Sequence, residues 1–217
     1  MKTPFADHAE RLQAFESSFI YPVVSSEFCG GRSVVEVIGS LAENGAKVVQ
    51  LREKHRSDRE LFQLACDCRR LTCRYGMLLF IDDRLDIALA CNADGVHLGQ
   101  EDMPLATARK IAPELIIGAS THNAAEVIAA QKEQCSYLNI GPIFTTQTKS
   151  VSCGSLGTEL FNELKNLVNV PFSVMGGIKE HHIPQLTAMG ARHIAMVTEV
   201  IAKPELCRLR REDFTAD

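Results

Sequence analysis

The stretch "ACNADGVHL" (residues 90–98) reads as the end of a helix, a tight turn and a buried β-strand. The same pattern recurs in "ENGAKVVQL" (43–51) and "AMGARHIAM" (188–196), where a glycine follows the helix. Glycine is the residue that most often stops a helix at its C-terminal end. Short strands that repeatedly follow helices in this way are typical of a parallel sheet with crossover helices.

Eight short apolar runs are candidate strands, and amphipathic helical patterns such as 33–44, 58–75, 123–134 and 182–190 lie between them. The candidate strands are 19–26, 47–53, 78–83, 95–100, 115–120, 137–143, 172–178 and 193–199. Eight strand–helix units in about 200 residues match a closed (β/α)₈ barrel, with an open doubly wound sheet as the alternative. We therefore predict an α/β fold: a single TIM-barrel domain over residues 1–217 with a short N-terminal helix.

The composition is that of a soluble globular protein, with 46% hydrophobic and 23% charged residues. The net charge of −4 gives no bulk attraction to nucleic acid or to an anionic membrane. No apolar run is long enough to span a membrane, and the N-terminus does not resemble a signal peptide. Cys66 and Cys68 point to different sides of a predicted helix, so they do not form a metal site. We expect eight reduced cysteines and a cytoplasmic location, and leave a homo-oligomer open.

Polar residues collect where the predicted strands end, which is where barrels of this class place their active sites. Gln50, Arg52 and Lys54 are spaced by two, so they are predicted to share one face of the second strand and to point at the mouth. Neighbouring cations are favourable when a polyanion lies between them. The alternative is a solvated, charged strand end.

Two acids follow adjacent strands, Asp83 after the third and Asp102 after the fourth. Carboxylates that converge near bound phosphates typically hold Mg²⁺. The alternative for Asp102 is a helix N-cap, because it precedes "MPLATARK" with an early proline.

Three further features lie at the same end of the predicted barrel. The loop after the sixth strand is long and polar, as binding loops often are, and it carries Lys149. The pair Gly176–Gly177 would let a phosphate approach the backbone closely. His97 and His122 are acid–base candidates by residue type, and His97 could equally pack inside the barrel.

Taken together, five segments resemble the thiamin phosphate synthase family in order and spacing. They are "QLREK" (50–54), "DDRLDIALACNADGVHLGQED" (82–102), "GASTH" (118–122), "NIGPIFTTQTK" (139–149) and "MGGI" (175–178). The resemblance implies a (β/α)₈ barrel and an Mg²⁺-dependent alkyl transfer. In that reaction hydroxymethylpyrimidine diphosphate and a hydroxyethylthiazole phosphate give thiamin phosphate, and pyrophosphate leaves. The expected partners are these phosphorylated small molecules.

The resemblance also implies roles for individual residues. The metal ligands would be Asp83 and Asp102, and the catalytic residues Ser120, near the pyrimidine, and Lys149, on the pyrophosphate. The pyrimidine diphosphate would be held by Gln50, Arg52 and Lys54, with Asp82 beside it. The thiazole phosphate would be received by Thr146, Thr148, Gly177, Val197 and Thr198.

Three positions depart from the family's usual pattern. Asp82 stands where an asparagine is usual, Glu199 where a small residue follows the strand 8 hydroxyl, and His182 where an asparagine is common. A carboxylate beside a phosphate weakens binding unless it is paired or points away. The alternatives are therefore a related thiazole tautomerase, a non-catalytic paralogue that binds phosphate ligands, and another phosphate-binding barrel enzyme. The intact "QED" and "TxTK" motifs argue against the tautomerase.

Overall fold

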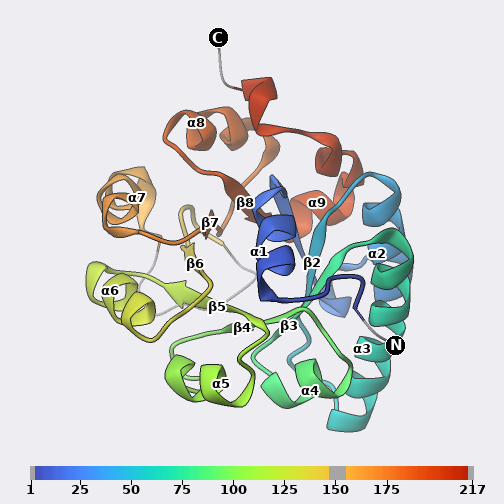
Figure 1. The fold of residues 1–217 in the computed structure, drawn as a ribbon. Helices are drawn as coiled ribbons and strands as arrows, with labels where there is room; N and C mark the ends of the chain where they lie inside the picture. The colour runs from blue at the N-terminus through green and yellow to red at the C-terminus, as the bar shows by residue number, and fades with distance from the viewer. Residues whose placement is uncertain (1–2, 147–154, 215–217) are drawn as a thin grey trace.

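The structure is a computed structural model that describes residues 3–146 and 155–214. Thr148 and Lys149, two of the predicted site residues, lie outside these ranges. The strands are β1 (Ile20–Val24), β2 (Val48–Leu51), β3 (Leu78–Asp82), β4 (Gly95–Leu98), β5 (Ile116–Thr121), β6 (Tyr137–Ile140), β7 (Phe172–Val174) and β8 (His193–Met196). They pair in parallel and in chain order, and β8 closes on β1. The predicted (β/α)₈ barrel is confirmed, and the open sheet is excluded (Figure 1).

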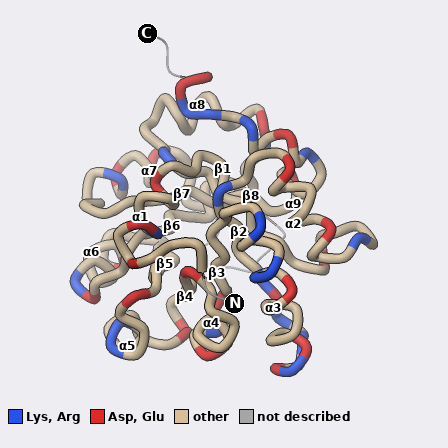
Figure 2. Tube along the Cα trace, turned by 45° about the vertical axis from the view of Figure 1, so that its right-hand side comes forward, with Lys and Arg blue, Asp and Glu red and all other residues tan. Residues whose placement is uncertain are grey.

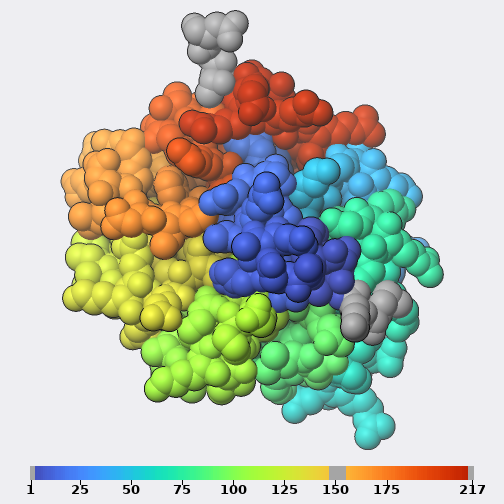
Figure 3. Space-filling view, viewed as in Figure 1, coloured from blue at the N-terminus to red at the C-terminus, as the bar shows by residue number. Residues whose placement is uncertain are grey.

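Helices surround the barrel, and α1 covers the amino end of its strands, at the centre of Figures 1 and 3. The helices are α1 (His8–Glu16), α2 (Val34–Glu43), α3 (Asp58–Tyr75), α4 (Leu85–Ala90), α5 (Leu105–Ile111), α6 (Ala124–Lys132), α7 (Gly157–Leu164), α8 (Ile183–Ala188) and α9 (Thr198–Ala202). Single 3₁₀ turns occupy Ser26–Phe28, Lys165–Leu167, Glu180–His182, Pro204–Arg208 and Arg211–Phe214. The predicted N-terminal helix is confirmed as α1.

Local sequence explains where the longest helix begins and ends. Ser57 and Glu60 form a reciprocal capping box at the start of α3, so two otherwise unpaired backbone N–H groups find acceptors. Gly76 ends α3 in the left-handed conformation, with φ of 64°. An equivalent capping box between Ser33 and Glu36 starts α2.

The core has two layers. Alternate strand residues face outward and pack against the helices, while the others fill the barrel. The ring of Phe15 from α1 closes the amino end, with its centroid 4.5 Å from that of Tyr137 and 4.7 Å from that of His193. The opposite end is therefore the one left for ligands.

Several strands are shorter at their carboxyl ends than predicted. Gly176 and Gly177 have φ of 102° and 61°, which a strand cannot contain, so β7 ends at Val174. β2 ends at Leu51, so the prediction that Arg52 and Lys54 share a strand face with Gln50 is wrong: both lie in the loop that follows.

Charges of both signs are distributed along the outer helices (Figure 2). In the part of the chain that is described, no helix is both long and apolar enough to cross a membrane. The assignment of residues 1–217 to one domain stays a prediction.

Candidate active site

The floor of the barrel mouth is built from inward-facing side chains of five consecutive strands. β2 supplies Gln50, β3 Asp82, β4 His97, β5 Ser120 and β6 Asn139. Each stands two residues after an inward-facing position of the barrel interior, so strand alternation turns it inward as well. The sequence analysis identified four of these as site residues or candidates and missed Asn139.

A chain of hydrogen bonds runs from the barrel interior to Ser120. The hydroxyls of Tyr21 and Tyr137 are 2.9 Å apart, and Tyr137 Oη lies 2.9 Å from His97 Nδ1. His97 Nε2 in turn lies 2.9 Å from Ser120 Oγ. Burial raises the pKa of both tyrosines, so the phenols stay neutral. His97 thus fixes the orientation of the Ser120 hydroxyl, a contact that the sequence analysis left unassigned.

Gly118 makes this arrangement fit. A Cβ atom at that position would overlap the ring of Tyr137, which lies across the neighbouring strand. Any larger residue would displace the phenol that bonds to His97. The glycine in "GASTH" therefore has a packing role.

Three carboxylates, Asp82, Asp83 and Asp102, meet at the ends of β3 and β4. Asp83 adopts a left-handed backbone conformation with φ of 61°, uncommon for a non-glycine residue, and its N–H donates to His97 O over 2.8 Å. Its carboxylate interacts with that of Asp102. Asp102 also accepts a hydrogen bond from Gly99 N over 2.6 Å.

The predicted alternative for Asp102, a helix cap, is wrong. α5 begins only at Leu105, Pro104 occupies its N-cap position, and no side chain caps this helix. The Asp102 carboxylate instead turns back to the loop after β4 and faces Asp83.

Two cations from the loop after β2 compensate these acids. Lys54 Nζ forms a close ion pair with Asp83 and lies 3.0 Å from Asp82 Oδ2, and Arg52 Nε lies 3.5 Å from the same oxygen. Burial alone would lower the pKa of Lys54, but Asp82 and Asp83 raise it above its usual value. Lys54 is therefore charged and sits among the carboxylates.

The acids differ in their affinity for protons. Burial and the nearby charge of Asp83 raise the pKa of Asp82 to about 6, against the pull of Lys54. Burial acts to raise the pKa of Asp83, but hydrogen bonds from Lys54 and Asp102 hold it below its usual value. Burial and Asp83 raise the pKa of Asp102, although Gly99 lowers it. Like charges in contact create strong local demand for a cation.

Within the described residues, no group of three or more His, Cys, Asp or Glu side chains could hold a metal ion. Mg²⁺ commonly uses one or two protein carboxylates and takes its remaining ligands from water and substrate phosphates. The hard oxygen donors of Asp83 and Asp102, forced together, fit such a site.

The loop after β7 comes close to the loop after β6. A Cβ on Gly177 would overlap the carbonyl oxygen of Thr145, so only glycine fits there. Thr198 begins α9, and Val197 stands directly before it. Thr146 lies at the edge of the described part of the β6 loop.

Glu199, one of the three departures, is paired. Its carboxylate lies 3.0 Å from Lys179 Nζ and 3.3 Å from Lys203 Nζ. Burial acts to raise the pKa of Glu199, but the two lysines hold it below its usual value. Lys179 Nζ also lies 3.4 Å from Thr198 Oγ1. The negative charge beside the expected phosphate position is therefore neutralised by a residue, Lys179, that the sequence analysis missed.

The two remaining histidines have local roles. The ring of His182 stacks on Phe144 at 3.9 Å, and its Nδ1 accepts the N–H of Lys179 over 3.0 Å. Burial, and then His181, lower the pKa of His182. His122 pairs with Glu126 over 2.8 Å at the start of α6, away from the acids.

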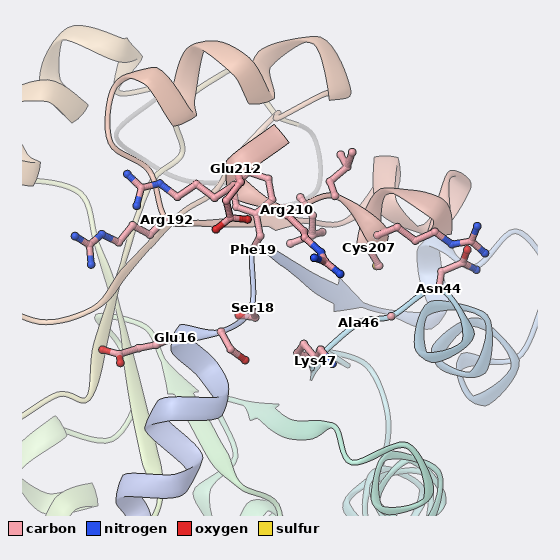
Figure 4. Close-up of a pocket in the computed structure, with 16 residues that line it drawn as sticks. Glu16, Ser18, Phe19, Asn44, Ala46, Lys47, Arg192, Cys207, Arg210 and Glu212 are labelled. Carbon is pink, nitrogen blue, oxygen red and sulfur yellow. The ribbon is translucent and has the colours of Figure 1, made fainter. Parts of the chain in front are cut away.

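The largest cavity among the described residues, of about 630 Å³, lies at the opposite end of the barrel (Figure 4). It is bounded by the end of α1, the starts of β1 and β2, and the C-terminal segment. Its cations, among them Lys47, Arg192 and Arg210, are solvent-exposed. It contains none of the predicted site residues.

Comparison with known proteins agrees with the geometry of the mouth. The family model described as "Thiamine monophosphate synthase" matches residues 20–200. A thiamine-phosphate synthase of Caldicellulosiruptor saccharolyticus is 38% identical over 198 residues, covering 91% of this chain and 90% of the relative. Another, from Pyrococcus horikoshii, is 42% identical over 76% of this chain and 80% of the relative.

Solved structures give the same result. A thiamine phosphate pyrophosphorylase from Pyrococcus furiosus superposes with a TM-score of 0.83 and 32% identity, covering 93% of this chain and all of the other. A 2-keto-3-deoxy-6-phospho-gluconate aldolase from Zymomonas mobilis, at 15% identity and a TM-score of 0.64, shares the fold alone.

Proposed function

The chain belongs to the thiamine monophosphate synthase family, and we propose how its barrel performs the reaction of a thiamine-phosphate synthase. This transferase joins hydroxymethylpyrimidine diphosphate to a hydroxyethylthiazole phosphate and yields thiamin phosphate. The single observation that carries the proposed mechanism is the juxtaposition of Asp83 and Asp102 with the cations of the β2 loop.

Asp83 and Asp102 would hold Mg²⁺. A bound Mg²⁺ would supply positive charge that stabilises pyrophosphate as it leaves. Lys54 and Arg52, which now compensate the acids, would be free to bind the diphosphate once a metal shares Asp83. Lys149 is proposed as a further cation on the pyrophosphate.

The remaining residues orient the reactants. Ser120, with its hydroxyl fixed by His97, would contact the pyrimidine near the carbon that is attacked. The thiazole nitrogen is already nucleophilic, so no side chain has to remove a proton from it. The thiazole phosphate would lie against Gly177 and the Val197–Thr198 turn, with Thr146 and Thr148 from the β6 loop.

The departures do not oppose this function. Glu199 is paired with Lys179 and Lys203, so the charge that favoured a non-catalytic paralogue is neutralised. Asp82 is paired with Lys54 and Arg52. We also propose a cytoplasmic location, since the seven cysteines in the described segments are free thiols.

The test is a two-substrate assay of the purified protein with and without Mg²⁺. We expect thiamin phosphate and pyrophosphate only with the metal, and a loss of about 100-fold or more in Asp83→Asn. Asparagine tolerates the left-handed backbone that Asp83 adopts, so the fold should persist.

The matched control is Asp86→Asn, which removes an exposed acid paired with Arg84 on the same turn. This variant should keep the wild-type rate. Product formation after complete chelation of divalent cations would exclude the metal role. A wild-type rate in Asp83→Asn would exclude the ligand assignment.

A further inference from the structure

Two buried amide groups at the floor of the mouth have atoms without hydrogen-bond partners in the described structure: Gln50 Nε2 and Asn139 Oδ1. The residues are only 2% and 5% exposed. A buried polar atom without a partner costs folding free energy, and natural interiors contain few of them. Such atoms therefore need an explanation.

The two amides face each other across the barrel. β2 and β6 are separated by three strands in one direction around the closed sheet and by three in the other. Both side chains point inward, Gln50 two residues after Val48 and Asn139 two residues after Tyr137 of the inner cluster. The space between them is the floor on which a bound ring would lie.

Neighbouring groups do not satisfy Asn139. Its Nδ2 donates only to the sulfur of Met175, over 3.7 Å, and a thioether is a weak acceptor. Ser173, its register partner on β7, donates to Leu138 O instead. His97 and Ser120 are bonded to each other. An apolar side chain would pack at position 139 without an unpartnered oxygen.

We propose that Asn139 is a specificity-determining residue for the amino group of the pyrimidine substrate. Its Oδ1 accepts a hydrogen bond from the exocyclic amine, and Gln50 Nε2 donates to a ring nitrogen from the opposite side. An aminopyrimidine presents this combination of a donor and an acceptor on one flat ring. The inference rests on the proposed function, whose reaction supplies the pyrimidine.

A site built to accept an N–H discriminates against an analogue that lacks it, since the acceptor then stays buried and unpartnered. We expect wild-type protein to prefer the aminopyrimidine diphosphate over the analogue with hydrogen in place of the amine by about 10- to 100-fold in kcat/KM. In Asn139→Leu this preference should fall to a few-fold, while the KM for the thiazole phosphate stays unchanged.

The experiment measures both preferences in wild type, Asn139→Leu and the control Ser173→Ala, and adds calorimetric binding of the uncharged aminopyrimidine alcohol. Ser173→Ala alters the adjacent inward position and should keep the wild-type preference. Thermal unfolding supplies a second readout: Asn139→Leu should be at least as stable as wild type, because it removes an unpartnered oxygen.

The outcomes separate the two proposals. If wild type binds the alcohol, Asn139→Leu does not, and no product forms, the inference holds and the proposed function fails. If product forms but Asn139→Leu keeps the full amino preference, or is strongly destabilised, the inference is wrong and the function stands. Wild type that neither binds the alcohol nor forms product overturns both.

Discussion

The two ends of the barrel treat charge in opposite ways. At the amino end, opposite charges meet: the fully buried Asp94 lies 2.5 Å from Arg69 Nη1 and accepts the N–H of Leu79 over 2.8 Å. At the carboxyl end, like charges meet, because Asp82, Asp83 and Asp102 converge and Lys54 lies among them.

This difference separates stability from function. The amino end is closed by Phe15 and by satisfied ionic contacts, so its residues serve the fold. The carboxyl end keeps features that cost folding free energy, such as the left-handed Asp83 and the unpartnered oxygen of Asn139. Features that a ligand relieves are expected at active sites.

The largest effect that would test this division is at Asp94. Asp94→Asn removes the negative charge that pairs with buried Arg69, and leaving a buried cation unpaired costs about 3–5 kcal/mol of unfolding free energy. The activity per folded molecule should stay at the wild-type value, because Asp94 lies at the end opposite the mouth. Denaturant unfolding and the two-substrate assay measure the two quantities.

The control is again Asp86→Asn, an exposed pair for which we expect a change below about 1 kcal/mol. If Asp94→Asn lost turnover in proportion to stability, or lost turnover alone, the two ends would not be functionally separate.

The sequence was sufficient for what depends on local patterns. Strand and helix periodicity, with glycines at helix ends, predicted the eight units, the closed barrel and α1. Placing the strand ends at one face also brought Asp83 and Asp102 to adjacent strands, where the structure has them.

Contacts between distant residues were not accessible in the same way. The bond from Tyr137 to His97 joins residues 40 positions apart, and the need for Gly118 follows from that ring. The pairing of Lys179 with Glu199 likewise spans two loops. Asn139 did leave a signal, an amide within the apolar run "YLNI", but a strand face cannot be assigned until the inner layer is known.

The next effect concerns pH at the closed end. Burial lowers the pKa of His193 to about 4, and its Nδ1 lies 2.5 Å from the backbone oxygen of Ser18. An unfolded histidine titrates near 6.5, so the unfolded chain binds this proton first as the pH falls. His193 therefore costs stability progressively between about pH 6.5 and 4, up to about 3 kcal/mol.

His193→Gln should flatten this acid limb, because glutamine cannot titrate and can still donate a hydrogen bond to Ser18. Urea unfolding from pH 7.5 to 4 measures the slope in both proteins. An unchanged slope would show that the base of the barrel does not hold His193 neutral.

The smallest effect is at the open end, and it should have the opposite sign. Asp82 is buried and its folded pKa is raised to about 6, so its stabilising contribution is present below about pH 4 and lost as the pH rises through 6. Asp82→Asn removes that cost, and we expect a gain of about 1–2 kcal/mol at pH 7.5 that disappears by pH 4. Lys54 would keep Asp83 as its partner, so the loss of one ion pair should not cancel the gain. The amide can also donate to a phosphate oxygen, so the KM for the pyrimidine diphosphate should fall. Unfolding curves at both pH values and initial rates measure these changes. A variant less stable than wild type at pH 7.5 would mean that Asp82 supports the fold as Asp94 does, and the contrast between the two ends would not extend to this residue.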